Sequence, residues 1–333
     1  MIWLSWRQFR VQLLVAVAAL FAVGVYLLIS GFQLHNAYNN ALAGCPNGGC
    51  SPVSQLTTQY SFPYYLGSGL VLLVPGLIGA FWGAPLIARE LETGTHRLIW
   101  NQSITRTRWL AVKLLSIVLA AVTTTGLLSL LVSWFASPLD RINNNRFIPL
   151  LFSARGVVPL GYAAFAVALG TCVGLLIRRS VPAMAAVLAV FAAVQVLMPL
   201  AVRPHLESPV HGNVALTSEA LKSASLIGFA NGTDPAAPFV ADLNVPGAWV
   251  LSGAEPVRTS SGQALTMATQ PCANVSDAAT HDACLAKADL HVTATYQPAD
   301  RYWAFQWYET AIFLALTAGL AGFSAWWLRG KLA

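Results

Sequence analysis

The segment Leu66–Ala88, LGSGLVLLVPGLIGAFWGAPLIA, runs for its whole length without Asp, Glu, Lys or Arg. A membrane-spanning helix needs about 20 predominantly apolar residues, because the hydrocarbon core is about 30 Å thick and a helix rises about 1.5 Å per residue. This segment has that length, and it carries no side chain that the centre of a bilayer would strongly penalise. It therefore predicts a transmembrane helix.

Further segments have the same character, and with the first they predict six transmembrane helices. Across the chain 56% of the residues are hydrophobic and 10% are charged, whereas an average soluble domain has about 25% charged residues. We therefore expect an all-α polytopic membrane protein. The other predicted spans are Val11–Gly31, Leu114–Phe135, Gly156–Ile177, Val181–Val202 and Thr310–Leu328.

The distribution of basic residues predicts the orientation. With both termini cytoplasmic, the cytoplasmic segments hold most of the basic side chains and the acids Glu90 and Glu92, and the first outer loop has no charged residue. The positive-inside rule favours this topology. The stretch between the third and fourth spans disagrees, because it holds three arginines and one acid. The cytoplasmic basic residues would be Arg7, Arg10, Arg89, Arg97, Arg106, Arg108, Lys113, Arg178, Arg179, Arg329 and Lys331.

The first ten residues, Met1–Arg10, carry two tryptophans and two arginines directly before the first span. Indole rings and basic side chains suit the headgroup level of a membrane. We interpret this stretch as a short interfacial helix, although ordinary flanking anchors would have the same composition.

A large water-exposed segment separates the fifth and sixth spans, from Arg203 to Phe305. Turn-rich runs and the strand-like stretch His291–Tyr296 predict a small mixed extracellular domain. The expected division is therefore 1–202 for five spans with the N-terminal helix and the cytoplasmic loop 88–113, 203–305 for the outer domain, and 306–333 for the sixth span and the tail.

The cysteines agree with the predicted orientation. Cys45 and Cys50 fall in the first outer loop, Cys272 and Cys284 fall in the last, and Cys172 lies within the fourth span. Pairs confined to one side suggest disulfide bonds in an oxidising compartment. The alternative is that all five are free thiols.

The second cytoplasmic segment begins with ARELETGTHRLIW, residues 88–100. We expect the second span to continue beyond the membrane as a helix, with Glu90 and Glu92 in water, until Gly94 ends it. Thr95 can then cap a short helix whose apolar side chains have no membrane to enter. An exposed apolar helix of this kind is typical of a protein-docking element.

These residues resemble the membrane subunit of ABC-2 type transporters, which have the ABCG-like exporter fold. The resemblance extends to six spans, an amphipathic N-terminal segment and cytoplasmic termini. The stretches Phe305–Thr310 and Trp326–Arg329 further resemble permeases of high-GC Gram-positive (actinobacterial) species. The residues in the places of the family motif are Glu90, Glu92, Gly94, Thr95, Leu98, Thr105, Arg106 and Lys113.

The resemblance implies that the loop is the coupling helix of an exporter permease and docks on a separate ATP-binding subunit, which would bind ATP and Mg²⁺. It also implies a pathway formed between two permease copies in contact with membrane lipids. The residues expected to couple to the ATPase are Glu90, Glu92, Gly94, Thr95, Arg97, Leu98, Trp100 and Arg106.

Polar and small residues inside the predicted spans have two readings. Thr123, Thr124, Thr125 and Gln195 are candidates to line a substrate pathway, although hydroxyl groups are also common at helix interfaces. The GxxxG pairs Gly79/Gly83 and Gly170/Gly174 predict close helix packing, and could also serve an interface between two copies.

The competing functions lack sequence support. The chain has no GxxxxGK[ST] loop, so hydrolysis of ATP would come from another chain. The predicted spans hold no acid or histidine, which disfavours a membrane-embedded enzyme and a proton-coupled carrier. The outer histidines match no metal-ligand spacing. We expect no catalytic residue, metal site, bound cofactor or nucleic-acid partner.

Two hypotheses therefore remain. The first is an ABC exporter permease that moves a hydrophobic or amphipathic substrate, such as a drug, antibiotic or lipid. The second is a membrane sensor or scaffold whose outer domain binds a ligand. An accompanying ATPase would distinguish the two.

Overall fold

The computed structural model forms two compact units. Unit 1 comprises Met1–Asn143, Pro149–Arg203 and Ala304–Ala333, and unit 2 comprises Asn144–Ile148 and Pro204–Trp303. The sequence placed the outer domain at 203–305; the structure adds the segment 144–148 to it. The described residues are 2–44, 51–93, 105–143, 146–217, 226–230, 234, 236–242, 245, 247–266, 269, 277, 280, 283–284 and 287–330.

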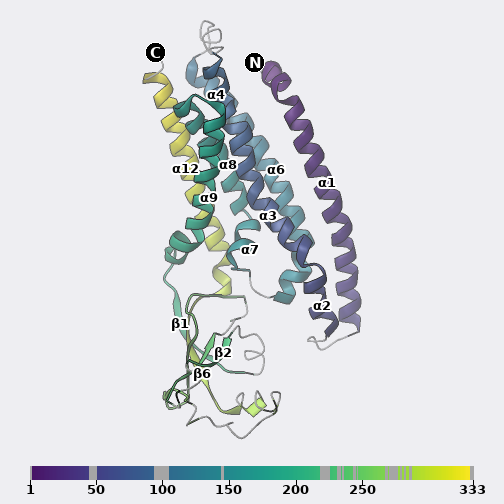
Figure 1. Cartoon of the computed structure of the whole chain (residues 1–333), viewed down its shortest axis with the longest axis vertical. Helices are drawn as coiled ribbons and strands as arrows, with labels where there is room; N and C mark the ends of the chain where they lie inside the picture. Colours follow the sequence, from purple (N-terminus) through teal and green to yellow (C-terminus); the bar gives the residue numbers. More distant parts are fainter. Residues whose placement is uncertain are drawn as a thin grey trace. The chain divides into compact units, whose positions relative to one another are not determined.

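Unit 1 is a bundle of helices, and the N-terminal end of α1 lies at the same end of the bundle as the C-terminal end of α12 (Figure 1). Its elements are α1 (Ile2–Ala43), α2 (Ser51–Gln59), α3 (Ser61–Ile78), the π-helical turn η1 (Gly79–Gly83), α4 (Pro85–Glu92), α6 (Arg106–Asn143), α7 (Pro149–Ala154), α8 (Val158–Ile177), α9 (Ser180–Leu197), the π-helical turn η2 (Met198–Val202) and most of α12 (Tyr302–Gly330). The 3₁₀ turn η3 (Arg203–His205) begins in unit 1 and ends in unit 2, and the first two residues of α12 belong to unit 2.

Six helical stretches among the described residues are long and apolar enough to cross a membrane, which confirms the predicted number. Several are longer than predicted. The stretch Ser61–Glu92 has 32 residues, or about 48 Å at 1.5 Å per residue, against a hydrocarbon core of about 30 Å. Each of these helices contains an apolar stretch of 18 residues, its apolar window, which has no charged residue, as expected. The helices continue beyond these windows and carry ionisable residues at their ends.

The N-terminal stretch that was expected to form a separate interfacial helix continues directly into α1. This helix has 42 residues without a break, or about 63 Å. About half of its length is therefore not needed to cross a hydrocarbon core. A position of the first ten residues at the membrane interface stays a prediction.

Helix α8 is the most buried of the six, with 78% of its apolar window buried. It packs against α3, η1, α4, α6 and α9. The two GxxxG pairs meet here: a Cβ atom on Gly170 would lie 2.2 Å from the carbonyl oxygen of Gly79, and one on Gly174 would lie 2.4 Å from that of Ala84. The predicted close packing is thus confirmed, but within one chain. These faces are covered and are not available to a second copy.

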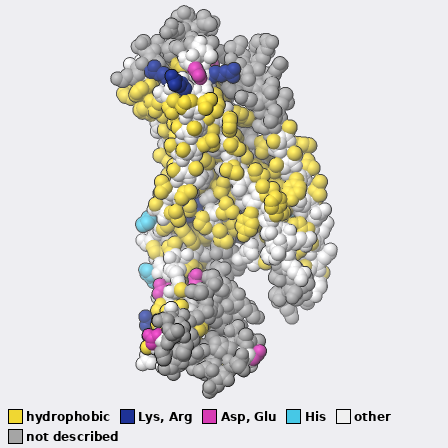
Figure 2. Space-filling view, in the orientation of Figure 1, with side chains coloured by type: hydrophobic (Ala, Val, Ile, Leu, Met, Phe, Trp, Pro, Cys, Tyr) yellow, Lys and Arg dark blue, Asp and Glu magenta, His cyan; other side chains and the backbone are white. Residues whose placement is uncertain are grey.

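The outer faces of unit 1 are apolar. Hydrophobic side chains dominate the length of the helices in the view of Figure 2. The windows of α1, α9 and α12 are each only 17% buried, and large side chains such as Phe21, Leu127, Leu130 and Val181 are exposed. Such surfaces suit lipid or another apolar helix, because water would not solvate them.

Unit 2 contains an antiparallel sheet with the strand order β1-β6-β5-β3-β2, and β4 pairs with β6. Strand β6 confirms the strand predicted from residue 291 and extends it to Gln297. A small apolar core includes Phe239, Val257, Leu265 and Val292. The strands are β1 (Val210–Ala215), β2 (Leu226–Phe229), β3 (Phe239–Asp242), β4 (Trp249–Val250), β5 (Glu255–Arg258) and β6 (His291–Gln297).

A short loop between α6 and α7 is built into unit 2. The ring of Phe147 is fully buried and stacks on Trp249 at a centroid distance of 6.2 Å. It also meets the ring of Tyr302 edge-on at 5.6 Å. Aromatic pairs at these distances are favourable beyond the area that they bury. Phe147 therefore anchors the loop in the sheet unit.

Candidate functional site

The end of α4 is the part of the predicted docking segment that the structure describes. The π-helical turn η1 precedes it, and the amide of Ala84 bonds to the carbonyl of Gly79, 2.9 Å away. The helix ends at Glu92, with Thr93 at the C-cap, as expected for a helix that stops before Gly94. The hydroxyl of Thr93 donates to the carbonyl of Arg89 at 2.8 Å.

Glu90 joins α4 to α6. Its carboxylate forms an ion pair with the ammonium group of Lys113, and this ammonium lies 4.6 Å from the ring centroid of Trp109. The side chains of Lys113 and Glu90 are 14% and 15% exposed. The sequence placed Glu90 in water, and this was wrong because the facing base on α6 draws the carboxylate inward. A half-buried, hydrogen-bonded pair stabilises more than an exposed one.

Glu92 joins α4 to the start of α9. Its carboxylate Oε2 accepts bonds from the Ser180 amide at 3.2 Å and from the Ser180 hydroxyl at 2.9 Å. Helix α8 ends just before this point, with Arg178 in the left-handed region and Arg179 extended. The first amides of a helix lack intrahelical partners and favour an anion. Glu92 therefore acts as a cap supplied by a different helix, while remaining exposed to water as predicted.

An apolar cluster lies under these polar bonds. Leu86 and Ile87 of α4 are buried together with Trp109 of α6, Leu175 of α8 and Leu328 of α12. Four helices, α4, α6, α8 and α12, therefore meet here. We call α4, held by this cluster and by the bonds of Glu90 and Glu92, the fixed base of the segment that follows it. Basic side chains gather at this end of unit 1 (Figure 2).

Most of the predicted coupling residues lie just beyond this fixed base. Gly94, Thr95, Arg97, Leu98 and Trp100 are outside the described residues, and the side chain of Arg106 at the start of α6 is also not described. The chain enters this segment from α4 and leaves it through α6. The Glu90–Lys113 pair joins these two helices, so it fixes both ends of the segment. The coupling role of the segment stays a prediction.

A second polar cluster is fully buried at the opposite end of the helices. The guanidinium of Arg203 donates from Nε to Glu309 Oε2 at 2.9 Å and from Nη2 to Glu309 Oε1 at 3.2 Å. The Tyr162 hydroxyl donates to the same carboxylate. Arg203 Nη2 also reaches the Ser153 hydroxyl at 2.7 Å. Arg203 and Glu309 are each 0% exposed, so both charges are removed from water and neutralise one another.

Gln306 holds the turn between α7 and α8 beside this cluster. Its Oε1 accepts the amides of Val157 and Val158 at 3.1 and 3.2 Å, and its Nε2 donates to the Phe152 carbonyl at 2.9 Å. Gly156 has a φ of +67°, and a Cβ there would lie 2.6 Å from Gln306 Oε1. Glycine is therefore required at this turn.

A third cluster holds the other side of the same turn. Arg155 pairs with Asp140 at 3.4 Å between Nε and Oδ2, and its Nη1 lies 3.1 Å from the Ser68 hydroxyl. The Tyr64 hydroxyl donates to Asp140 Oδ1 at 2.5 Å. The short helix α7 and the turn after it are thus held by α12 and η3 on one side and by α3 and α6 on the other.

These ion pairs were not predicted from the sequence, because each charged residue lies just outside a predicted span. An available signal was that Arg203 follows the fifth span and Glu309 precedes the sixth, so consecutive spans bring them to the same end. Arg155 is neutralised by Asp140, but the loop between the third and fourth spans keeps the net positive charge that disagrees with the predicted topology.

The candidate pathway residues do not form one surface. Thr123 is exposed and its hydroxyl donates to the carbonyls of Leu119 and Ala120, whereas Thr125 is fully buried. Successive residues of a helix point about 100° apart, so Thr123, Thr124 and Thr125 cannot share a face. Their role in a pathway stays a prediction, as does that of Gln195, which is partly buried on α9.

The remaining predicted sites stay open. Cys45, Cys50 and Cys272 are outside the described residues, and Cys284 packs against the apolar core of unit 2, so the two disulfide bonds stay predictions. Cys172 is a buried free thiol. Among the described residues, no three His, Cys, Asp or Glu side chains come together in a way that could hold a metal ion.

Comparison with known proteins yields one match. Residues 17–203 match the model of a family described as "ABC-2 membrane transporter related". This stretch is more than half of the 333 residues. It includes α1 from residue 17 onward and all helices from α2 through η2, with the fixed base of α4 and the Arg155 cluster. No curated protein and no solved structure matches the chain.

Proposed function

The chain belongs to the ABC-2 membrane transporter related family, and from this we propose that it is the permease subunit of an ATP-driven exporter, working with a separate ATP-binding subunit. Membership makes the chain a multi-pass membrane protein and an ABC transporter permease. The direction of transport, the class of substrate and the separate ATPase go beyond family membership and belong to the proposal.

The fixed base of α4 is the observation that carries the proposal. A docking segment transmits force only if its ends move with the helices that it controls. The segment 94–104 leaves a helix end that is bonded to α6 by Glu90 and to α9 by Glu92. Movement of this segment by a nucleotide-dependent partner would therefore be passed to at least three helices of unit 1.

We further propose that two copies of the chain form the pathway, with both termini cytoplasmic and the membrane being a bacterial plasma membrane. The exposed apolar faces of α1, α9 and α12 offer surface for a second copy and for lipid. The same faces support a hydrophobic or amphipathic substrate, such as a drug, antibiotic or lipid, because a route between such faces would be largely apolar.

The test is co-purification of the ATP-binding subunit with the full chain. Replacement of Leu98 and Trp100 by Asp should abolish co-purification and substrate-stimulated ATP hydrolysis, because buried apolar anchors supply most of the energy of an interface. The matched control carries Leu98→Met and Trp100→Phe, which keep apolar anchors, and it should retain both. Membrane insertion should be the same in all three proteins.

The alternative is a sensor or scaffold with a ligand-binding outer unit. It has the same helical architecture and predicts no dependence on the segment 94–104. If the Asp double variant assembles with the ATPase and transports like the wild type, the coupling assignment is wrong and the sensor function is favoured.

A further inference from the structure

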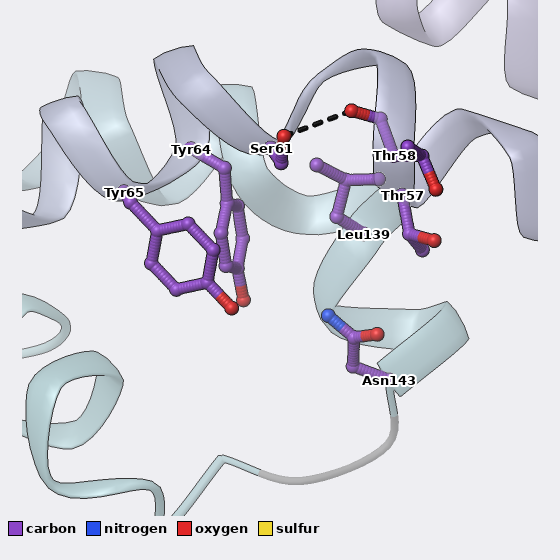
Figure 3. Close-up of a pocket in the computed structure, with 7 residues that line it drawn as sticks. All are labelled: Thr57, Thr58, Ser61, Tyr64, Tyr65, Leu139 and Asn143. Carbon is purple, nitrogen blue, oxygen red and sulfur yellow. Dashed lines mark hydrogen bonds between the residues drawn. The ribbon is translucent and has the colours of Figure 1, made fainter.

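A cavity of about 380 Å³ lies in unit 1 between α2, the start of α3 and the end of α6. In Figure 1 these elements meet at the end of the bundle away from the N-terminus of α1 and the C-terminus of α12. Figure 3 shows the two tyrosine rings of the wall side by side, with the Asn143 amide on the α6 side. The lining residues are Thr57, Thr58, Ser61, Tyr64, Tyr65, Leu139 and Asn143.

The wall of this cavity is mostly polar and carries no charge. It combines aliphatic hydroxyls, two phenols and an amide with one purely apolar side chain, Leu139, and no lining residue is charged. Sites for drug-like molecules of about 300–1,000 Å³ are lined mainly by apolar side chains. An apolar molecule would leave the polar groups of this wall unsatisfied, and an ion would lack a counter-charge on it. The wall therefore suits a neutral, polar ligand.

The hydrogen bonds within the wall determine which hydrogen-bonding groups a ligand needs. Ser61 donates its hydroxyl hydrogen to the Thr58 carbonyl at 2.8 Å, and Tyr64 donates its hydrogen to Asp140 at 2.5 Å. The Tyr64 side chain also hydrogen-bonds to the Asn143 side chain. The Ser61 and Tyr64 oxygens can each accept one further bond but have no hydrogen left to donate. At these two oxygens a ligand must therefore supply the hydrogen, as the hydroxyl groups of a polyhydroxylated molecule do.

Two further features complete the site. Arg155 pairs with Asp140, so the carboxylate that orients the Tyr64 hydroxyl is itself fixed from behind. Tyr65 is 57% exposed, and its ring meets that of Tyr64 edge-on at 5.4 Å. An exposed phenol presents a flat apolar face with a polar tip. Such a face complements the C–H side of a sugar ring, whose edge carries the hydroxyl groups.

We propose that this cavity binds a neutral polyhydroxylated ligand, namely a sugar, either free in solution or as the headgroup of a glycolipid. The Tyr65 ring packs on the apolar side of the sugar. The oxygens of Ser61 and Tyr64 accept from its hydroxyl groups, and the Asn143 amide both donates and accepts. This site is separate from the coupling segment and does not depend on the proposed transport function.

The experiment uses the full chain, purified without sugar-based detergents and placed in phosphatidylcholine nanodiscs. In the first arm, saturation-transfer difference NMR measures contact with free maltose. In the second arm, mass spectrometry measures whether glucosyl-diacylglycerol, mixed with phosphatidylcholine, is selectively retained after delipidation. Binding in the first arm identifies a free sugar, and binding only in the second identifies a glycolipid headgroup. Binding in neither arm overturns the proposal.

Substitutions of the lining residues test whether the sugar binds in this cavity. Asn143→Ala removes one amide and should weaken binding roughly 3- to 10-fold, as expected for one hydrogen bond. Tyr65→Ala removes the ring that packs on the sugar and should weaken binding at least as much, whereas Tyr65→Phe keeps this ring and should bind like the wild type. The matched control is Tyr308→Phe, an equally conservative change at an exposed tyrosine of α12, which should have no effect. Unchanged binding in Tyr65→Ala and Asn143→Ala, with intact size-exclusion profiles, would also refute the proposal.

Discussion

The buried pair of Arg203 and Glu309 gives the sharpest stability prediction. Glu309 accepts two bonds from Arg203 and one from Tyr162, and both charged side chains are fully buried. Removing one partner leaves an uncompensated charge in the interior, which typically costs about 3–5 kcal/mol. Replacing both charges by apolar groups of similar volume is often close to neutral.

We therefore expect Arg203→Met and Glu309→Leu to lower the free energy of unfolding by about 3–5 kcal/mol each. The double variant should lose far less than the sum, because it removes both the attraction and the two desolvation penalties. The double-mutant cycle should yield a coupling energy of about 3 kcal/mol or more, at the upper end of the range for residues in contact.

The assay is reversible unfolding of the full chain in mixed micelles by sodium dodecyl sulfate, followed by tryptophan fluorescence. Arg301 and Glu207 provide a matched control, because their ion pair has a similar length of 3.0 Å but side chains 30% and 25% exposed. Neutralising one of these residues should cost about 1 kcal/mol or less. Additive losses at Arg203 and Glu309, or losses no larger than those of the control, would refute the reasoning.

Other predictions address the packing, the topology and the outer cysteines. Gly170→Ala should destabilise the chain by about 2–4 kcal/mol, as overpacking against backbone does, whereas Gly319→Ala, with open space around its Cβ, should be neutral or stabilising in a thermal unfolding assay. Single cysteines placed near His96 should be protected from an impermeant thiol reagent in intact cells, whereas one at Asp234 should be labelled; the reverse pattern would invert the topology. Mass spectrometry of unreduced peptides should show the two outer cysteine pairs as local bridges, each worth about 2–3 kcal/mol by the loop-entropy model, and four free thiols would contradict this.

The sequence was sufficient for features that depend on local composition. Six apolar runs of bilayer length predicted six spans, and alternation from His291 onward predicted a strand that the structure extends to Gln297. The termination of α4 before Gly94 also followed from local rules, because glycine disfavours the helix interior. In each case the signal lies within a single element.

Features that depend on partners were harder to predict. Spacing alone could not show that Gly79 and Gly170 face one another, because GxxxG indicates a close approach without naming the other helix. Glu90 was wrongly interpreted as solvated because the sequence does not show that Lys113 lies beside it. The bond between Glu92 and Ser180 was not predicted for the same reason, although Glu92 is exposed as expected. The three adjacent threonines are a different case: helical geometry shows that they do not share one face, and their role in a pathway stays a prediction.

The packing of Phe147 in unit 2 affects whether unit 2 can be removed or exchanged as an independent domain. A domain inserted between two spans is joined to its host by two peptide crossings and can be exchanged or shortened there. Here the chain passes between the units twice more, on either side of the segment 144–148. A shortened protein in which residue 203 is linked to residue 304 would lack Trp249 and Tyr302. The aromatic ring of Phe147 would then be exposed to water. Modular exchange of the sheet unit therefore requires the α6–α7 loop to be replaced along with it.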